Sequence, residues 1–145
     1  MPSMDEGIQS ALQAIAADYG LLAIYVFGSR AEEVAALAAG NPVAPAHPDS
    51  DVDIGVLPLH HQVLTAQDRV RVTHRLETLV RAPRVDLVVL PEADAFLAAD
   101  VVRGELLLAV DLDAEAEAQL YYLRRAADLA PLLREQWRET IGGAT

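Results

Sequence analysis

The sequence predicts a domain in which α-helices and β-strands alternate, of the α/β or α+β class. Four apolar runs typical of strands are separated by segments with helical periodicity. The chain has 145 residues, 52 % of them hydrophobic and without an internal repeat, so it is long enough to bury its own core. We therefore expect one domain over 1–145, with a core at about 21–110 and a C-terminal helix at about 113–140.

The first helix is expected over residues 3–19. Ile8, Leu12 and Ile15 recur there at the spacing of one helical face, and a glycine follows the last residue. Residues 21–27 come next and favour a strand, because the run is continuous, apolar and rich in β-branched and aromatic side chains.

The second helix is expected over residues 30–39, which are rich in alanine, glutamate and leucine. Three prolines then fall within residues 42–48 and exclude both a helix and a central strand, so we expect an exposed loop. After the strand at 52–57, a third helix is expected over 65–81, because Thr65 and Asp68 have the spacing of a capping box.

The remaining elements alternate in the same way. A strand at 84–90 is followed by a short amphipathic helix at 92–103 and by a strand at 105–110, which we place near a sheet edge. A long helix is expected over 114–139. Its apolar face is predicted to consist of Ala116, Leu120, Leu123, Ala127, Ala130 and Trp137.

That apolar face has two interpretations: it packs on the core, or it docks a partner helix. We favour the core for Leu120 and Ala127. Tyr121 and Tyr122 are interpreted as packing residues and not as nucleophiles.

Charge and composition exclude several classes of protein. The net charge is −11 and no basic patch is visible, which argues against direct nonspecific nucleic-acid binding. There is no cysteine, so disulfide scaffolds, thiolate metal sites and cysteine nucleophiles are excluded. The N-terminus lacks a signal pattern and no apolar run is long enough for a membrane span, so we expect a soluble cytoplasmic protein without a membrane partner.

An Asp-x-Asp pair opens the second predicted strand. Strand side chains alternate between faces, so Asp51 and Asp53 are expected to project from the same face. Two carboxylates on one face repel each other unless a cation lies between them, and a hard divalent ion with oxygen ligands is the usual solution. The alternative interpretation is a polar strand end with two solvated acids.

A third acid lies in the next strand. Asp86 interrupts a run of valines and leucines, where a carboxylate is costly to bury without a partner. It is expected either to lie beside Asp51 and Asp53, so that the three hold two magnesium ions, or to pair with Arg84 at a strand end.

A Gly-Ser pair ends the first predicted strand. Gly28 allows close backbone approach, and Ser29 offers a hydroxyl at the N-terminus of the following helix, a position that accepts anions such as phosphate. Ser29 is also expected to cap that helix. Arg30 is expected to pair either with a phosphate or with a nearby acid.

Together these motifs resemble those of the minimal nucleotidyltransferases of the DNA polymerase β superfamily. The resemblance rests on Phe27-Gly28-Ser29-Arg30, Ser50-Asp51-Val52-Asp53-Ile54 and Val85-Asp86-Leu87-Val88. The later run Val102-Arg103-Gly104-Glu105-Leu106-Leu107-Leu108, with Asp111 and a helix containing Tyr122, Arg125 and Asp128, is similar to the tail of MNT-type antitoxins.

The resemblance implies a small mixed sheet with flanking helices and transfer of AMP from ATP to a hydroxyl. In MNT antitoxins the acceptor is a tyrosine of a HEPN ribonuclease toxin, so a hetero-oligomer with such a toxin is implied. Gly28, Ser29 and Arg30 would then bind the nucleotide. The acids Asp51, Asp53 and Asp86 would be both catalytic residues and Mg²⁺ ligands.

Two other functions share the same motifs: transfer to a small molecule such as an aminoglycoside, and an antitoxin that acts by contact without catalysis. The chain also departs from the family pattern, which has a shorter spacer between Ser29 and Asp51. The added residues fit a longer helix and the proline loop, and surface insertions of this kind cost little free energy.

Overall fold

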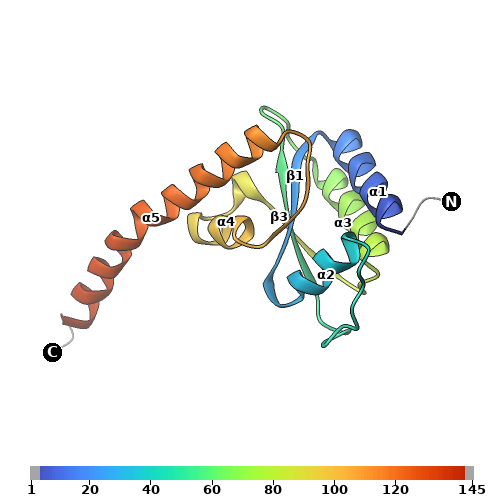
Figure 1. Cartoon of the computed structure of the whole chain (residues 1–145). Coiled ribbons are helices and arrows are strands. Elements are labelled where there is room, and N and C mark those ends of the chain that lie inside the picture. Colours follow the sequence, from blue (N-terminus) through green and yellow to red (C-terminus); the bar gives the residue numbers. More distant parts are fainter. Residues whose placement is uncertain (1–3, 143–145) are drawn as a thin grey trace.

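The computed structural model describes residues 4–142 and contains a four-stranded sheet flanked by helices (Figure 1). Its strands are β1 (Leu21–Phe27), β2 (Val52–Pro58), β3 (Val85–Val89) and β4 (Glu105–Ala109). The strand order is β3-β2-β1-β4. Strand β1 is antiparallel to β2 and to β4, whereas β2 is parallel to β3. The mixed sheet confirms the expected fold class, and β4 lies at an edge as predicted.

Helices cover both faces of this sheet. The described helices are α1 (Met4–Tyr19), α2 (Ala31–Ala38), α3 (Ala66–Val80), α4 (Ala95–Val102) and α5 (Leu112–Gly142), with 3₁₀ turns η1 (Gly28–Arg30) and η2 (Leu90–Glu92). Helices α1, α2 and α3 lie on one side, and α4 and the start of α5 lie on the other (Figure 1). Among the helices described, none is long and apolar enough to cross a membrane.

The alternation of side chains along the central strand separates two cores. Ile24 packs with Leu12 of α1 and Leu76 of α3 on one face. Tyr25 packs with Val101 of α4 on the opposite face. Because β1 and β2 are covered on both faces, they read as continuous apolar runs, which is why they were predictable from sequence.

Capping residues explain where the helices begin. The predicted capping box is confirmed, since Thr65 and Asp68 each accept the other's backbone N–H at 3.0 Å. Helix α4 begins later than predicted, at Ala95, because Asp94 Oδ1 caps it. Helix α5 begins earlier than predicted, because Asp111 Oδ1 accepts the first free N–H groups. The predicted start of the first helix at residue 3 lies outside the described residues.

Helix α5 buries a different face from the one predicted. Leu120 is 52 % exposed and Ala127 is also exposed, so the expectation that they pack in the core was wrong. The buried positions are Glu115, Tyr122 and Ala126. Tyr122 is therefore a packing residue as predicted, whereas Tyr121 is 59 % exposed and contacts only the edge-on ring of Tyr122 among the described aromatic residues. The second half of α5 extends away from the sheet (Figure 1).

A buried hydrogen bond sets the rotation of α5. The Tyr25 hydroxyl donates to Glu115 Oε1 at 2.7 Å, and both side chains are buried. Burial and the bond to Glu115 raise the pKa of Tyr25 well above its usual range, so the hydroxyl keeps the proton that it donates. A glutamate on a helix is ordinarily assigned to the solvent face, and for this reason the sequence pattern gave the wrong rotation.

Loss of this bond is expected to destabilise the fold. Tyr25→Phe leaves the Glu115 carboxylate buried without its donor, so the free energy of unfolding should fall by about 1–3 kcal/mol in urea titrations. Tyr122→Phe is the control, because the Tyr122 hydroxyl makes no hydrogen bond within the described part of the chain. Equal losses in the two variants would contradict the assignment.

Candidate functional site

The sheet brings the predicted site residues to one edge. Phe27, the last residue of β1, pairs with Asp53 of β2, and Asp53 pairs in register with Asp86 of β3. Because β1 is antiparallel to β2 and β2 is parallel to β3, the end of β1 meets the starts of both other strands. Asp86 therefore lies on the strand beside Asp53, as predicted, and Asp51 lies just before β2.

Gly28 sits against the carboxylate of Asp53. Its φ is +78°, and a Cβ at this position would collide with Asp53 Oδ2. The left-handed backbone therefore favours a glycine here, and the absence of a side chain leaves room for the Asp53 carboxylate. Gly28 and Ser29 are exposed in the turn η1, at the mouth of the group of acids.

Ser29 does not cap the following helix. The N-cap of α2 is Arg30, and it has no side-chain capping bond, so that prediction was wrong. Ser29 belongs to the 3₁₀ turn η1, so α2 begins only after Arg30 and the serine does not occupy the N-cap position. Within the described residues the Ser29 hydroxyl makes no hydrogen bond, and it faces solvent beside the site.

The three acids repel one another. Partial burial raises the pKa of the Asp53 carboxyl above its usual value, and the charges of Asp86 and Asp51 raise it further. Arg84 Nε lies 3.6 Å from Asp86 Oδ1 and 3.8 Å from Asp51 Oδ2. The pairing of Asp86 with Arg84, one of the two sequence interpretations, is thus present. Arg84 is 70 % exposed, so its attraction to the acids is weak.

The donor set fits a magnesium ion in its chemistry. Carboxylate oxygens are the ligands that this ion prefers, and a cation would relieve the repulsion that raises the pKa of Asp53. In residues 4–142, however, no three histidine, cysteine, aspartate or glutamate side chains already form a metal-holding group. The acids lie at one edge without a closed cage, and Arg84 lies beside two of them.

A cleft opens next to the glycine turn. Its volume is about 570 Å³, and it separates the start of α2 from the end of α4 and the start of β4. Gly55 lies two residues after Asp53 on β2. It has no side chain and so leaves room for Val101, which lets α4 pack close to this region. The cleft is lined by Phe27, Gly28, Ala31, Glu32, Asp100, Arg103, Gly104 and Glu105. A larger hollow, of about 700 Å³, runs along the outer side of α5, away from the acids.

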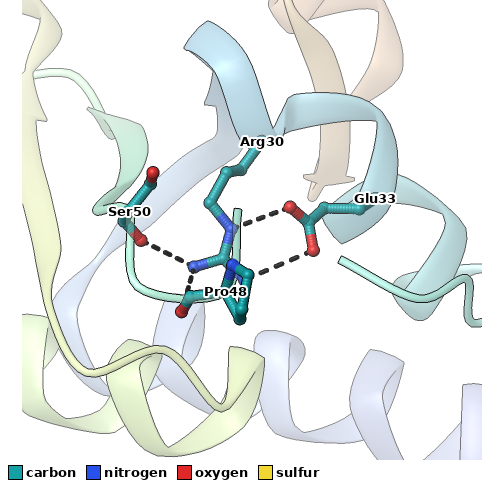
Figure 2. Close-up of polar contacts among 4 residues, drawn as sticks. All are labelled: Arg30, Glu33, Pro48 and Ser50. Carbon is teal, nitrogen blue, oxygen red and sulfur yellow. Dashed lines mark hydrogen bonds and ion pairs between the residues drawn. The ribbon is translucent and has the colours of Figure 1, made fainter. Parts of the chain in front are cut away.

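Arg30 is buried and holds an acid and two carbonyl groups (Figure 2). Its Nε donates to Glu33 Oε1 at 2.8 Å and its Nη2 to Glu33 Oε2 at 3.3 Å. Its Nη1 donates to the carbonyl of Ser50 at 2.7 Å and to that of Pro48 at 3.5 Å. Of the two predicted partners, the nearby acid is thus the one in contact. The role of Arg30 as a nucleotide ligand stays a prediction.

A family model described as polymerase beta, nucleotidyltransferase matches residues 10–113, which are most of the chain. The chain belongs to the polymerase beta nucleotidyltransferase family. The matched residues include all four strands and the acids Asp51, Asp53 and Asp86. No curated protein is significantly similar in sequence to this nucleotidyltransferase.

Several solved structures share the fold of this nucleotidyltransferase. A MntA–HepT toxin–antitoxin complex has a TM-score of 0.63 at 20 % identity, covering 92 % of this chain and 97 % of the other. A toxin–antitoxin structure with AMP-PNP gives 0.65 at 22 % identity, with 92 % and 98 % covered. A tri-AMPylated Shewanella oneidensis HEPN toxin in complex with MNT antitoxin gives 0.54 at 22 %, with 92 % and 99 % covered.

Sequence reasoning did not identify two partners of Arg30 in this nucleotidyltransferase. Glu33, which orients Arg30, follows it by three residues, a spacing at which helical side chains meet. That spacing was a usable signal. The contact of Arg30 with the carbonyl of Ser50 had no signal in the sequence, because every residue carries a carbonyl group. Only the path of the loop brings this carbonyl near the guanidinium.

Repulsion in the site predicts that the metal-free nucleotidyltransferase is destabilised by its own acids. In EDTA at pH 7, Asp53→Asn should raise the free energy of unfolding by about 0.5–1 kcal/mol, because it removes the carboxylate whose ionisation the fold disfavours. A raised folded-state pKa means that the wild type gains stability as pH falls through that pKa toward the unfolded value, and the variant should lose this gain. Thermal melts across pH 7 to 4 would measure it.

The exposed loop residue Asp49 provides the control for net charge. Asp49→Asn changes the charge by the same amount and should leave the melting temperature unchanged. A variant Asp53→Asn that is less stable than the wild type in EDTA would contradict the repulsion.

Proposed function

We propose that this chain is a cytoplasmic antitoxin that transfers AMP from ATP to a tyrosine hydroxyl of a HEPN-family toxin, with Mg²⁺, and thereby silences it. The observation that carries the proposal is the meeting of Gly28, Asp53 and Asp86 at one sheet edge of a nucleotidyltransferase domain. The chain is similar to antitoxins solved in complex with their toxins, and in one of these complexes the toxin is AMPylated. This similarity supports a toxin as the acceptor of AMP.

Each site residue has a role in this reaction. The Gly28–Ser29 turn would receive the triphosphate through its backbone N–H groups and the free serine hydroxyl. Asp51, Asp53 and Asp86 would hold two Mg²⁺ ions, which supply positive charge against the phosphates and assist ionisation of the acceptor hydroxyl. The structure with AMP-PNP supports ATP as the substrate.

The transfer step needs one proton acceptor. A tyrosine hydroxyl has a pKa near 10 and is a weak nucleophile at neutral pH. Asp86 is half-exposed at the edge of the site, where it would take that proton as the phenolic oxygen bonds to the α-phosphorus. The bond from the α-phosphorus to the bridging oxygen breaks, and pyrophosphate leaves.

The partner must lie across this exposed edge. The net charge of −11 suits a toxin surface of opposite sign, which would speed association at low salt. A hetero-oligomer would place the toxin tyrosine against the cleft beside Gly28.

Label transfer tests the proposal. The chain is co-expressed with the protein of the neighbouring gene, and the purified complex is incubated with Mg²⁺ and ATP labelled at either the α- or the γ-phosphate. Label from the α-position only, on a tyrosine of the partner, is the expected result. Label from the γ-position would mean phosphoryl transfer, and no label from either would overturn the proposed activity.

A further inference from the structure

The segment that connects the Gly28–Ser29 turn and α2 to the acids of β2 makes few contacts that hold it in place. Residues 39–51 contain no helix or strand, and residues 39–49 are exposed. The backbone hydrogen bonds of this segment are local: those of Gly40 and Asn41 close the end of α2, and Ser50 N–H donates to His47 within the loop itself. The segment ends at Asp51, one residue before β2. For Asp51 to act as a metal ligand at the end of such a loop, the loop needs a further contact that holds it in place.

Arg30 provides that contact. Arg30 is 6 % exposed, and a buried cation is unfavourable unless it is paired and hydrogen-bonded. Glu33 supplies the countercharge through two bonds, and the side chain of Glu33 is 17 % exposed. The short bond of 2.7 Å to the carbonyl of Ser50 is charge-assisted and therefore stronger than a neutral one.

Sequence neighbours make this contact relevant to the site. Arg30 directly follows Ser29 of the glycine turn, and the carbonyl that it binds belongs to the residue directly before Asp51. The guanidinium thus joins the turn that faces the cleft to the strand that carries the acids, and Figure 2 shows it between Glu33 and the loop. No other side chain in the described range makes a hydrogen bond to the backbone of 48–51.

We propose that Arg30, held by Glu33, is a positioning residue that fixes Asp51 relative to the Gly28–Ser29 turn. The inference rests on the proposed function for the meaning of Asp51 as a metal ligand, but the anchoring of the loop does not. It assigns the arginine to the protein backbone and not to the nucleotide. Partners that orient metal ligands change metal affinity or activity by about 10–100-fold when they are removed.

Two substitutions in the full chain, alone and combined, test it beside one control. Arg30→Lys keeps the charge but cannot bond Glu33 and the carbonyl of Ser50 in the same plane. Glu33→Gln weakens the pair from its other side and keeps the proposal testable if the first variant folds poorly. Arg75→Lys is the matched control, because Arg75 of α3 forms an ion pair of 2.7 Å with Asp18 of α1, outside the site.

Two measurements separate anchoring from general stability. Amide hydrogen exchange should accelerate at least about tenfold at Ser50 and Val52, whose N–H groups donate to the carbonyls of His47 and Arg84, in Arg30→Lys and in Glu33→Gln. It should stay unchanged in β1 and α4. Mn²⁺ binding in the absence of nucleotide should weaken by about 10-fold in the same two variants and not in Arg75→Lys. The double variant should lose little more than Arg30→Lys alone, because the two side chains act as one unit.

The outcomes distinguish this inference from the proposed function. Unchanged exchange at Ser50 and Val52 would overturn the positioning role. Weaker ATP binding in EDTA, with exchange and Mn²⁺ affinity unchanged, would also overturn it and assign Arg30 to the nucleotide. Wild-type protein that binds no Mn²⁺ would count against the proposed metal site, and faster exchange in the variants would still support the anchoring of the loop.

Discussion

Asp53→Asn is expected to lower AMP transfer to the toxin by about a thousandfold, or about 4 kcal/mol in the activation barrier. Asp53 pairs in register with Asp86, follows Asp51 by two residues and lies against Gly28, so it adjoins both other acids and the glycine turn. An asparagine keeps the shape but removes the charge that would hold a cation. Initial rates of α-label transfer, with a fixed excess of ATP and Mg²⁺, measure the loss.

Binding to the partner should survive this substitution. Asparagine keeps the size of the aspartate side chain, so the contacts at the sheet edge are retained, and in EDTA the variant is expected to be the more stable protein. Co-elution of variant and toxin in size exclusion would show that loss of transfer is not loss of assembly. Asp49→Asn, with the same change of charge on an exposed loop, should transfer AMP at the wild-type rate.

The same variant decides between a catalytic antitoxin and one that acts by contact. If Asp53→Asn binds the toxin but no longer restores growth of cells that express it, silencing requires transfer. Full neutralisation by the variant would favour contact alone and would overturn the proposed mechanism. Arg84 lies beside two of the acids and partly offsets their charge without a metal ion, so the experiment tests a specific alternative.

Gly28→Ala is expected to have the second largest effect. The residue has a φ of +78°, where an alanine is strained by about 1–2 kcal/mol, and its Cβ would collide with the Asp53 carboxylate. Both effects displace the turn that would bind phosphate. We expect ATP affinity, measured by calorimetry, to fall at least about tenfold and the free energy of unfolding to fall by about 1–2 kcal/mol.

Gly7→Ala is the matched control within the same chain. Gly7 lies inside α1, and a Cβ there would meet nothing within 4 Å. Since alanine is the better helix former, this variant should be more stable by about 0.5–1 kcal/mol and should bind ATP normally. If Gly28→Ala behaved in the same way, the close approach of the turn to Asp53 would have no functional role.

Much of the site was predictable because its signals are local. Gly28 ends an apolar run, and Asp53 and Asp86 interrupt two others, so polar residues at the ends of buried strands stand out in the sequence. The capping box of Thr65 and Asp68 was equally readable, since both partners lie within one helical turn. Patterns of this kind depend on neighbours in the chain and need no knowledge of the fold.

Long-range partners were not predictable in the same way. Arg30 could be assigned to an acid or to a phosphate, and only the folded path of the loop brings the carbonyl of Ser50 to its guanidinium. The face of α5 that packs was misjudged, because its anchor is a buried Glu115 whose partner, Tyr25, lies ninety residues earlier. Hydrophobicity alone places a glutamate outside.

The strands, their apolar faces and the residue types of the site could thus be predicted from short segments, because periodicity and propensity are local properties. Which ends of the strands meet depends on the tertiary fold. The antiparallel pairing of β1 with β2 and the parallel pairing of β2 with β3 place Gly28, Asp53 and Asp86 together. Strand direction and register follow from the whole core, and no short segment contains that information.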